Sequence, residues 1–377
     1  MTLFFCRIFR PLHVLMAGQH APIRQVLRHL LAATVGLACV VPAGAAPIGA
    51  PMASAPELTA PALAPNSAPA PAEADAGDTL TTASPTLERI RQRGRIELGY
   101  RQSAVPFSFA DKHEQPQGLA WAMCQKIVPA IQRELGLPHL VRVPVRVIEQ
   151  MRAPLVKGDA IDIDCAPSTV TPERAEQVAF SLPYYAAHVR LMVRRGSGIG
   201  SIDAMRGLRL VVVQGTTAER LVRARQAEIG FQLLMARDYD EAFHLLRERR
   251  GQALALDDVL LQGLRTTTKT PDAFRVVGPP LADTPEYYAL VLRKDDPAFK
   301  AVVDAALVEL FRSGEMARLQ GRWFQNPTPP YGVNLHMLPS PEVQALWEAG
   351  GQASPQASRR ESRQEAHQEA HQESRQE

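Results

Sequence analysis

Hydrophobic residues in the middle of the chain recur with two different periods. Segments such as 95–101 (RIELGYR) and 141–148 (VRVPVRVI) alternate apolar and polar residues, which is typical of strands. Segments such as 118–135 (GLAWAMCQKIVPAIQREL) instead place their apolar residues on one helical face. A helix at 150–158 and a strand at 160–165 continue this order. The alternation of strands and helices predicts an α/β fold with mostly parallel sheet.

The same alternation begins again near residue 188. Expected strands of this second unit span 188–195, 208–215, 231–236 and 253–258. Expected helices between them span 216–229 and 239–250. A further strand at 285–296, a long helix from Pro297 and a helical segment at 313–327 follow. The pattern therefore indicates two α/β units in series.

The two ends of the chain lack this pattern. Arg24 and Arg28 precede a short apolar run at 30–41 and then small residues, so 1–45 is predicted to be a signal peptide. The Ala/Pro-rich stretch 46–85 is predicted to be an extended linker. An alternative to a chain that begins near Ala46 is a lipidated chain that begins at Cys39, the last residue of the sequence GLAC. These features predict export from the cytoplasm.

The C-terminal segment 348–377 is predicted to be a low-complexity polar tail. His367 and His371 are four residues apart and could face one metal ion. A solvated polar segment explains the same residues better, because their surroundings match no known catalytic helix. We therefore expect no metal site and no cofactor.

Composition narrows the class of protein further. The chain has 377 residues and a net charge of +3, without a basic stripe carrying interleaved aromatic residues. This pattern argues against a nucleic-acid partner. Of four cysteines, only Cys124 and Cys165 follow the presequence. They could form a disulfide in an oxidising compartment or remain as two buried free thiols, and their spacing decides neither.

Several motifs, in order, resemble the bacterial polar amino-acid solute-binding proteins of ABC importers, and among these the glutamate/aspartate receptors. The matching segments are LERIRQRGRIELGYRQSAVPFSF, TPERAEQVAFSLPYY, VVQGTTAE, ALALDDVLL, LRKDDPAFKAVVDAAL and SGEMARLQGRWFQNPTPP. The resemblance implies a two-lobed type II periplasmic binding fold with two crossover strands and a central ligand cleft. Lobe 1 would comprise 86–187 and 288–347, and lobe 2 would comprise 188–287. It also implies a monomeric periplasmic receptor, not an enzyme, that delivers an acidic amino acid to an inner-membrane permease.

The resemblance assigns one group of residues to the α-carboxylate of the ligand. Arg174 matches the family's guanidinium clamp, and Thr169 matches the neighbouring hydroxyl donor. Ser168 is a further hydroxyl in the same loop. Thr217 matches the position in lobe 2 from which the family makes its second contact with the ligand's carboxylate. Thr171 is expected to cap the helix that begins after it, because Thr before Pro and Glu is typical of a helix start.

The resemblance assigns other residues to the ligand's ammonium group. Asp257 matches the family's aspartate for this group, and it ends an apolar strand where a carboxylate needs a partner. Asp258 is expected to cap the next helix. Pro167 replaces a small residue of the family, and it keeps a carbonyl acceptor but has no amide donor.

The residues expected around the ligand's side chain do not all predict the same ligand. Arg101 and Arg152 match two arginines of the acidic-amino-acid receptors, which predicts a ligand with a second carboxylate. Tyr239 stands in place of a family histidine and can still donate a hydrogen bond. Glu149 stands in place of a small hydroxyl residue. If Glu149 points into the cleft, it would cancel one arginine charge and favour a less anionic amino acid or a related polar metabolite.

Two alternatives use the same scaffold. One is a dehydratase-like enzyme in which Glu149 acts as general acid. The other is a ligand sensor that docks a membrane partner and is tethered through the linker. The sequence predicts a binding protein rather than either of these.

Overall fold

The computed structural model describes residues 84–353. The predicted signal peptide, Cys39, nearly all of the linker, His367 and His371 lie outside these residues. The described chain begins with α1 (Pro85–Arg93) and ends with α10 (Pro341–Gln352), which continues past the predicted start of the tail at 348. None of the described helices combines the length and the apolar character needed to cross a membrane.

The first lobe is built around a sheet in the order β5-β1-β6-β14-β7, with β8 also paired to β14. These strands are β1 (Arg95–Tyr100), β5 (Val141–Arg146), β6 (Ile163–Thr169), β7 (Ala179–Phe180), β8 (Tyr185–Ala187) and β14 (Glu286–Leu292). β1 is parallel to β5 and β6, as predicted. β14 is antiparallel to β6, β7 and β8, so only part of the sheet is parallel. The difference arises because β14 enters this sheet on its return from the other lobe.

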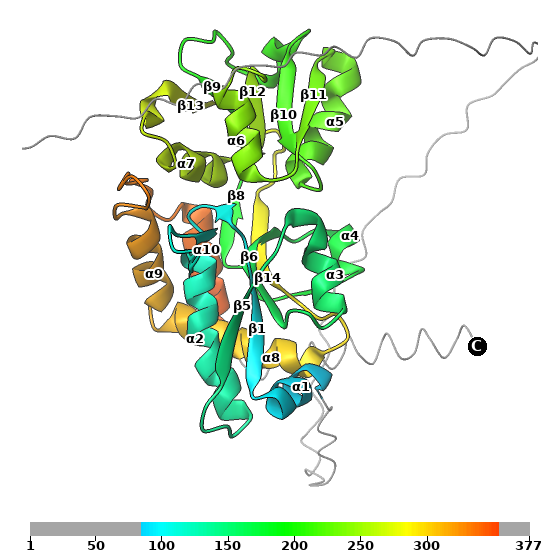
Figure 1. Ribbon diagram of the computed structural model, residues 1–377, viewed down its shortest axis with the longest axis vertical. Coiled ribbons are helices and arrows are strands. Elements are labelled where there is room, and N and C mark those ends of the chain that lie inside the picture. Colours follow the sequence, from blue (N-terminus) through cyan, green and yellow to red (C-terminus); the bar gives the residue numbers. More distant parts are fainter. Residues whose placement is uncertain (1–83, 354–377) are drawn as a thin grey trace, which may run out of the picture. The chain divides into compact units, whose positions relative to one another are not determined.

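Helices cover both faces of this sheet (Figure 1). α2 packs against β6 on one face, where Ile96 and Leu98 of β1 belong to the largest buried apolar cluster. α3 packs on the opposite face with Val147 and Val291. The helices that follow α1 in this lobe are α2 (Leu119–Glu134), α3 (Arg152–Lys157), α4 (Pro172–Ala175), α8 (Pro297–Arg312) and α9 (Glu315–Phe324), and a 3-10 turn spans Glu149–Met151.

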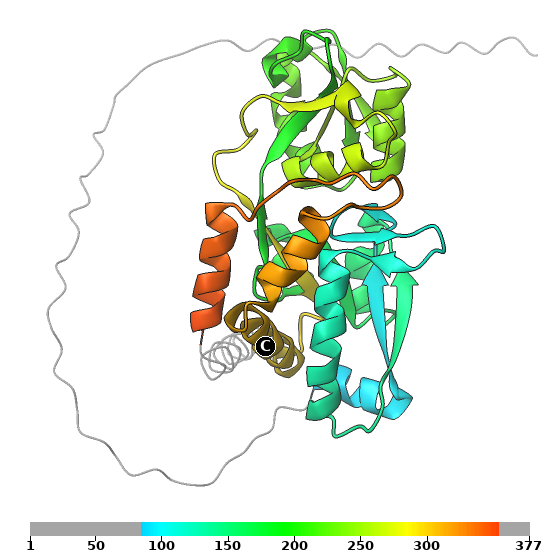
Figure 2. The ribbon, with the colours of Figure 1, turned by 90° about the vertical axis from the view of Figure 1, so that its left-hand side faces the viewer.

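The C-terminal helix α10 lies beside α8, as Figure 2 shows. A small separate sheet consists of β2 (Ser103–Ala104), β3 (Ser108–Ala110) and β4 (Pro116–Gln117).

The second lobe is built around a sheet in the order β11-β10-β12-β9-β13. Its strands are β9 (Val189–Arg194), β10 (Arg209–Val213), β11 (Gln232–Ala236), β12 (Ala253–Asp257) and β13 (Phe274–Val277). Its helices are α5 (Thr217–Ile229), α6 (Tyr239–Arg247) and α7 (Asp258–Thr266), with 3-10 turns at Ile202–Met205 and Pro271–Ala273. Val222 of α5 packs with Val212 on one face, whereas α6 packs with Val211 on the other. The alternation of strands and helices agrees with the α/β class predicted from the sequence. The sheet is only partly parallel, because β9 is antiparallel to β12 and β13.

Local sequence signals explain where the helices of the second lobe begin. Thr216 caps α5, because its hydroxyl accepts a hydrogen bond from the Glu219 amide. Asp238 caps α6 in the same way through the Glu241 amide. Each cap places the following residue in the first turn of its helix, so α5 begins at Thr217 and α6 at Tyr239. Two candidate site residues therefore owe their positions to capping.

Close backbone contact joins β2 of the first lobe to α7 of the second. A β-carbon added to Gly263 of α7 would lie 1.9 Å from the Val105 carbonyl oxygen. Only a residue without a side chain allows this approach. The largest buried cluster accordingly includes Val105 together with Leu260 and Leu264 of α7.

Cys124 of α2 and Cys165 of β6 form a disulfide, with 6.1 Å between their α-carbons. The sequence left this pairing open. The bond links the helix that covers the first sheet to the strand that carries Thr169. It therefore anchors one wall of the candidate site.

Reducing this disulfide is expected to lower the free energy of unfolding by about 2–4 kcal/mol, because the bond closes a long loop in the unfolded chain. Cys124 and Cys165 are separated by 41 residues. Urea unfolding with and without reductant measures the effect. A Cys124→Ala, Cys165→Ala double variant is the control, since reductant should not change its midpoint. An equal midpoint for the oxidised and reduced wild type would contradict the expectation.

Candidate functional site

The segment that follows β6 positions the main cationic candidate, Arg174. Thr171 caps α4 by accepting a hydrogen bond from the Arg174 amide at 3.2 Å, as predicted. α4 has only four residues, so its dipole adds little. Any anion binding here must therefore come from the guanidinium group itself.

The Arg174 guanidinium joins the two lobes. Its Nη1 donates to the Thr169 carbonyl at 3.0 Å, and its Nη2 donates to the Gly215 carbonyl at 3.1 Å. Thr169 ends β6, and Gly215 precedes α5 of the second lobe. A second hydrogen bond between the lobes runs from Gln150 Nε2, in the 3-10 turn of the first lobe, to the Gln214 carbonyl at 3.1 Å. Arg174 thus lies between the lobes, with a planar donor group suited to a carboxylate.

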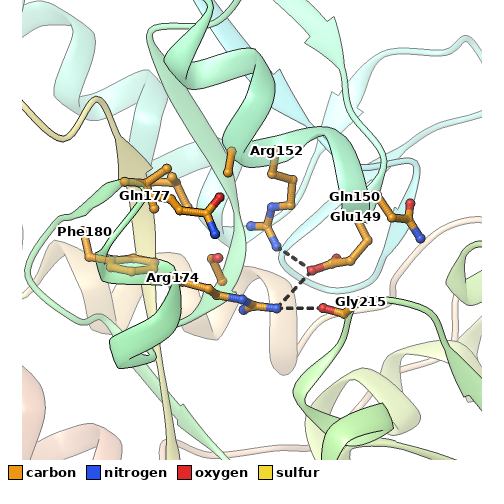
Figure 3. Close-up of a pocket in the computed structure, with 11 residues that line it drawn as sticks. Glu149, Gln150, Arg152, Arg174, Gln177, Phe180 and Gly215 are labelled. Atoms are coloured by element: carbon orange, nitrogen blue, oxygen red, sulfur yellow. Dashed lines mark hydrogen bonds and ion pairs between the residues drawn. The ribbon is translucent and has the colours of Figure 1, made fainter.

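Glu149 points toward Arg152 and Arg174 (Figure 3) and, with Arg101, these residues form a charged cluster. The structure thus answers whether Glu149 faces the expected site, which the sequence left open. Its carboxylate forms a short ion pair with Arg101 Nη1, and its Oε1 lies 3.4 Å from Arg152 Nη1 and 3.5 Å from Arg174 Nη2. Only 5% of the side chain is exposed. Burial raises the pKa of the Glu149 carboxyl, but the guanidinium groups outweigh this effect and lower that pKa to about 2. The carboxylate is therefore ionised at neutral pH.

Arg152 has a second buried partner. Its Nε donates to Asp164 Oδ2 at 2.5 Å, and the Asp164 side chain is fully buried. Burial lowers the pKa of Arg152, but Asp164 and Glu149 raise it above its usual value. Arg152 Nη2 is buried and has no hydrogen-bond partner among residues 84–353. This donor is therefore shielded from solvent and unpaired among the described residues.

Tyr239 packs against Arg101. The guanidinium carbon of Arg101 lies 4.8 Å from the centre of the Tyr239 ring. Burial raises the pKa of Tyr239, as does the nearby Glu149 carboxylate, so the phenol stays protonated. In this arrangement Tyr239 supports Arg101 through its ring face.

Glu286 belongs to the cluster, although sequence reasoning did not identify it. Its Oε2 accepts hydrogen bonds from the Thr169 hydroxyl at 2.7 Å and from the Thr217 hydroxyl at 2.6 Å. Glu286 begins β14, so it sits where the chain returns to the first lobe. The only sequence signal was its position at the start of a predicted crossover strand. Its carboxylate takes the two hydroxyl donors that the resemblance assigned to the ligand.

Asp257 lies close enough to Glu286 for their two carboxyl groups to interact. Asp257 Oδ2 accepts a short hydrogen bond from the Tyr288 hydroxyl, and Oδ1 is buried without a partner among the described residues. Burial raises the pKa of Asp257 well above its usual value, and Glu286 raises it further. The free oxygen is suited to accept from an ammonium group. Asp258, predicted to cap α7, is its first residue and accepts from the backbone amides of His188 and Val259.

A cavity of about 110 Å³ opens beside this cluster. It is lined by Glu149, Gln150, Arg152, Ala153, Ser168, Arg174, Gln177, Val178, Phe180, Gly215 and Val291. Four of the candidates, Glu149, Arg152, Ser168 and Arg174, thus face one space. Arg101, Thr169, Thr217, Asp257 and Tyr239 join the cluster through the contacts above without lining the cavity. Pro167 is buried in β6 and does not line it either.

The cluster combines cationic and anionic groups. It contains three guanidinium groups, on Arg101, Arg152 and Arg174, and four carboxyl groups, on Glu149, Asp164, Asp257 and Glu286. Residues 84–353 hold no group of three or more His, Cys, Asp or Glu suited to a metal ion. The site can therefore bind a small polar molecule through charge-assisted hydrogen bonds of both signs.

Comparisons with known proteins agree with this architecture. The chain matches the bacterial extracellular solute-binding proteins, family 3, over residues 96–326. It is 36% identical over 264 residues to the L-glutamate/L-aspartate-binding protein of Pseudomonas aeruginosa, which covers 69% of this chain and 87% of that protein. It is 34% identical over 278 residues to the glutamate/aspartate import solute-binding protein of Salmonella typhimurium, covering 73% and 91%. The solved cysteine-binding protein of Campylobacter jejuni is 25% identical, with a TM-score of 0.55, and covers 63% of this chain and 92% of that one.

Proposed function

Because this chain belongs to family 3 of the bacterial extracellular solute-binding proteins, we propose that it captures a polar α-amino acid between its lobes and delivers it to an ABC permease. Membership confirms the two-lobed type II fold that the resemblance implied. The observation that carries the proposal is the position of Arg174 between the lobes, bonded to Thr169 and to Gly215. In this proposal Arg174 holds the α-carboxylate and the free oxygen of Asp257 accepts from the ammonium group.

The identity of the ligand's side chain is the finer question. The names of the two relatives and the presence of Arg101 and Arg152 support glutamate or aspartate, as predicted from the sequence. The buried carboxylate of Glu149 weighs against a second carboxylate at the same place. The polar α-amino acids to test first are therefore glutamate, aspartate and their two amides.

The relatives are named as binding proteins, which confirms that this chain is a binding protein rather than an enzyme. The charge state of Glu149 points the same way. A dehydratase that used Glu149 as general acid would need this carboxyl protonated near neutral pH. Three guanidinium groups instead keep its pKa at about 2.

The setting of the protein is part of the same proposal. We infer export to the periplasm, a monomeric receptor and an inner-membrane permease as partner, supported by the family's extracellular class. The Cys124–Cys165 disulfide also fits an oxidising compartment. Cleavage near 45 and tethering at Cys39 concern residues outside 84–353.

A thermal-shift screen against the twenty amino acids tests the proposal. A ligand that binds only the folded state stabilises it by about 2.7 kcal/mol at a concentration 100 times its dissociation constant. We expect a concentration-dependent rise in melting temperature for at least one of the four amino acids above. Prephenate and arogenate serve as controls for the dehydratase alternative, with product formation as the readout. A flat response to all twenty amino acids would refute amino-acid binding.

A further inference from the structure

Glu149 already occupies the guanidinium groups that would receive a side-chain carboxylate. Its carboxylate contacts Arg101 and Arg152, the two arginines matched to that end of the ligand, and it is almost fully buried. A ligand carboxylate entering the same space would meet this charge at close range. Like charges that are buried together repel strongly, because little water screens them. The site is therefore poorly matched to a dicarboxylic amino acid.

The cavity wall contains both hydrogen-bond donors and hydrogen-bond acceptors. Arg152 Nη2 is a buried donor without a partner among the described residues, and Arg152 lines the cavity. Glu149 lines the same cavity and offers carboxylate lone pairs. Ser168 and Gln177, which also line it, are neutral and polar. A ligand group that both accepts and donates hydrogen bonds would therefore pair with the polar side chains that line the cavity.

A carboxamide has this combination. Its oxygen accepts hydrogen bonds and its NH2 group donates two, whereas an ionised carboxylate only accepts. The amide oxygen can accept a hydrogen bond from one of the guanidinium groups that line the cavity, on Arg152 or Arg174, and the amide NH2 can donate to Glu149. A side-chain carboxylate on the ligand has no NH2 group to donate, so it would place a second negative charge next to the Glu149 carboxylate. A side chain that ends in a carboxamide has nearly the same size as one that ends in a carboxylate, so charge and hydrogen bonding decide which of the two ligands binds more tightly.

The carboxyl groups of Asp257 and Glu286 are consistent with a zwitterion that has no further negative charge. Glu286 takes the hydroxyl hydrogen bonds of Thr169 and Thr217 and lies near Asp257. Two carboxyl groups there favour a cationic ammonium group. Arg174 provides the matching donors for one carboxylate, the α-carboxylate.

We propose that Glu149 makes this site select an α-amino acid whose side chain ends in a carboxamide, glutamine or asparagine, over the corresponding dicarboxylic acid. The proposal rests on the amino-acid-binding function inferred above. It assigns Glu149 a direct specificity role that Arg101 and Arg152 alone would not produce.

Titration calorimetry on the full exported protein, refolded to remove bound ligand, tests this selection. We expect wild type to bind glutamine or asparagine at least ten times more tightly than the matching acid. Glu149→Gln should reverse the preference, because it removes the buried charge and keeps the side chain's size. Glu149→Ser, which is smaller, should shift the ratio in the same direction.

The matched control is Glu228→Gln on α5, where Glu228 is exposed and pairs with Arg225. It should leave the ratio of amide to acid affinity unchanged. A wild type that prefers glutamate or aspartate, or binds only another amino acid, overturns the selection but leaves amino-acid binding intact. Failure to bind any of the twenty amino acids overturns both. The wild-type ratio decides even if the Glu149 variants do not fold.

Discussion

Replacing Arg174 by alanine should weaken the binding of every amino-acid ligand roughly 100-fold. Truncating one partner of a desolvated charge pair typically costs about 2–5 kcal/mol. Arg174 is the guanidinium that joins Thr169 of one lobe to Gly215 of the other. Its loss would remove both the proposed carboxylate donor and a contact between the lobes. Calorimetry with several amino acids of different side chains measures the loss.

Two variants sharpen this test. Arg174→Lys keeps the charge but loses the planar pair of donors, so its affinity should fall between wild type and Arg174→Ala. Arg225→Ala removes an arginine from the exposed face of α5 and should leave affinity unchanged. An Arg174→Ala protein that binds as tightly as wild type would show that the α-carboxylate is held elsewhere.

Arg152→Ala should lower the free energy of unfolding by about 3–5 kcal/mol, whatever it does to binding. Removing one partner of a buried ion pair leaves an uncompensated charge inside the protein. That charge is on Asp164, which is fully buried and lies 2.5 Å from Arg152 Nε. Urea unfolding of the ligand-free protein measures the loss.

A double variant separates the ion pair from other causes. Arg152→Met combined with Asp164→Asn removes both charges and should recover much of the lost stability. The exposed Arg225→Ala variant should change stability by less than about 0.5 kcal/mol. If Arg152→Ala is as stable as wild type, the buried pair contributes nothing to the fold. Because Arg152 is expected to support the fold as well as the ligand, the selectivity of the site is better tested through Glu149.

The fold class was readable from the sequence because strand and helix patterns are local. The segment 95–101 alternates with period two and became β1, and 216–229 shows a helical face and became α5. Thr171 was recognised as a helix cap because its role depends on residues within three positions. The parallel order was predicted less well, since the direction of β14 depends on how the chain returns between lobes.

The candidate site was predicted in part, and its errors have a common origin. The motifs placed Arg101, Arg152 and Arg174 in one site, and the structure brings all three to Glu149. Glu286 was missed, because a glutamate at the start of an apolar strand has no distinctive local pattern. Its partners Thr169 and Thr217 lie 117 and 69 residues away.

The sequence by itself determined the two α/β units, the family and the residue types available for an amino acid. Only the tertiary structure decided that Glu149 points inward, that Glu286 takes two hydroxyl donors, and that Cys124 and Cys165 form a disulfide. Local patterns reflect hydrogen bonds and burial within one turn or strand. Contacts between distant segments depend instead on how the sheets and helices pack, and these contacts decide which charges in the site remain free for a ligand.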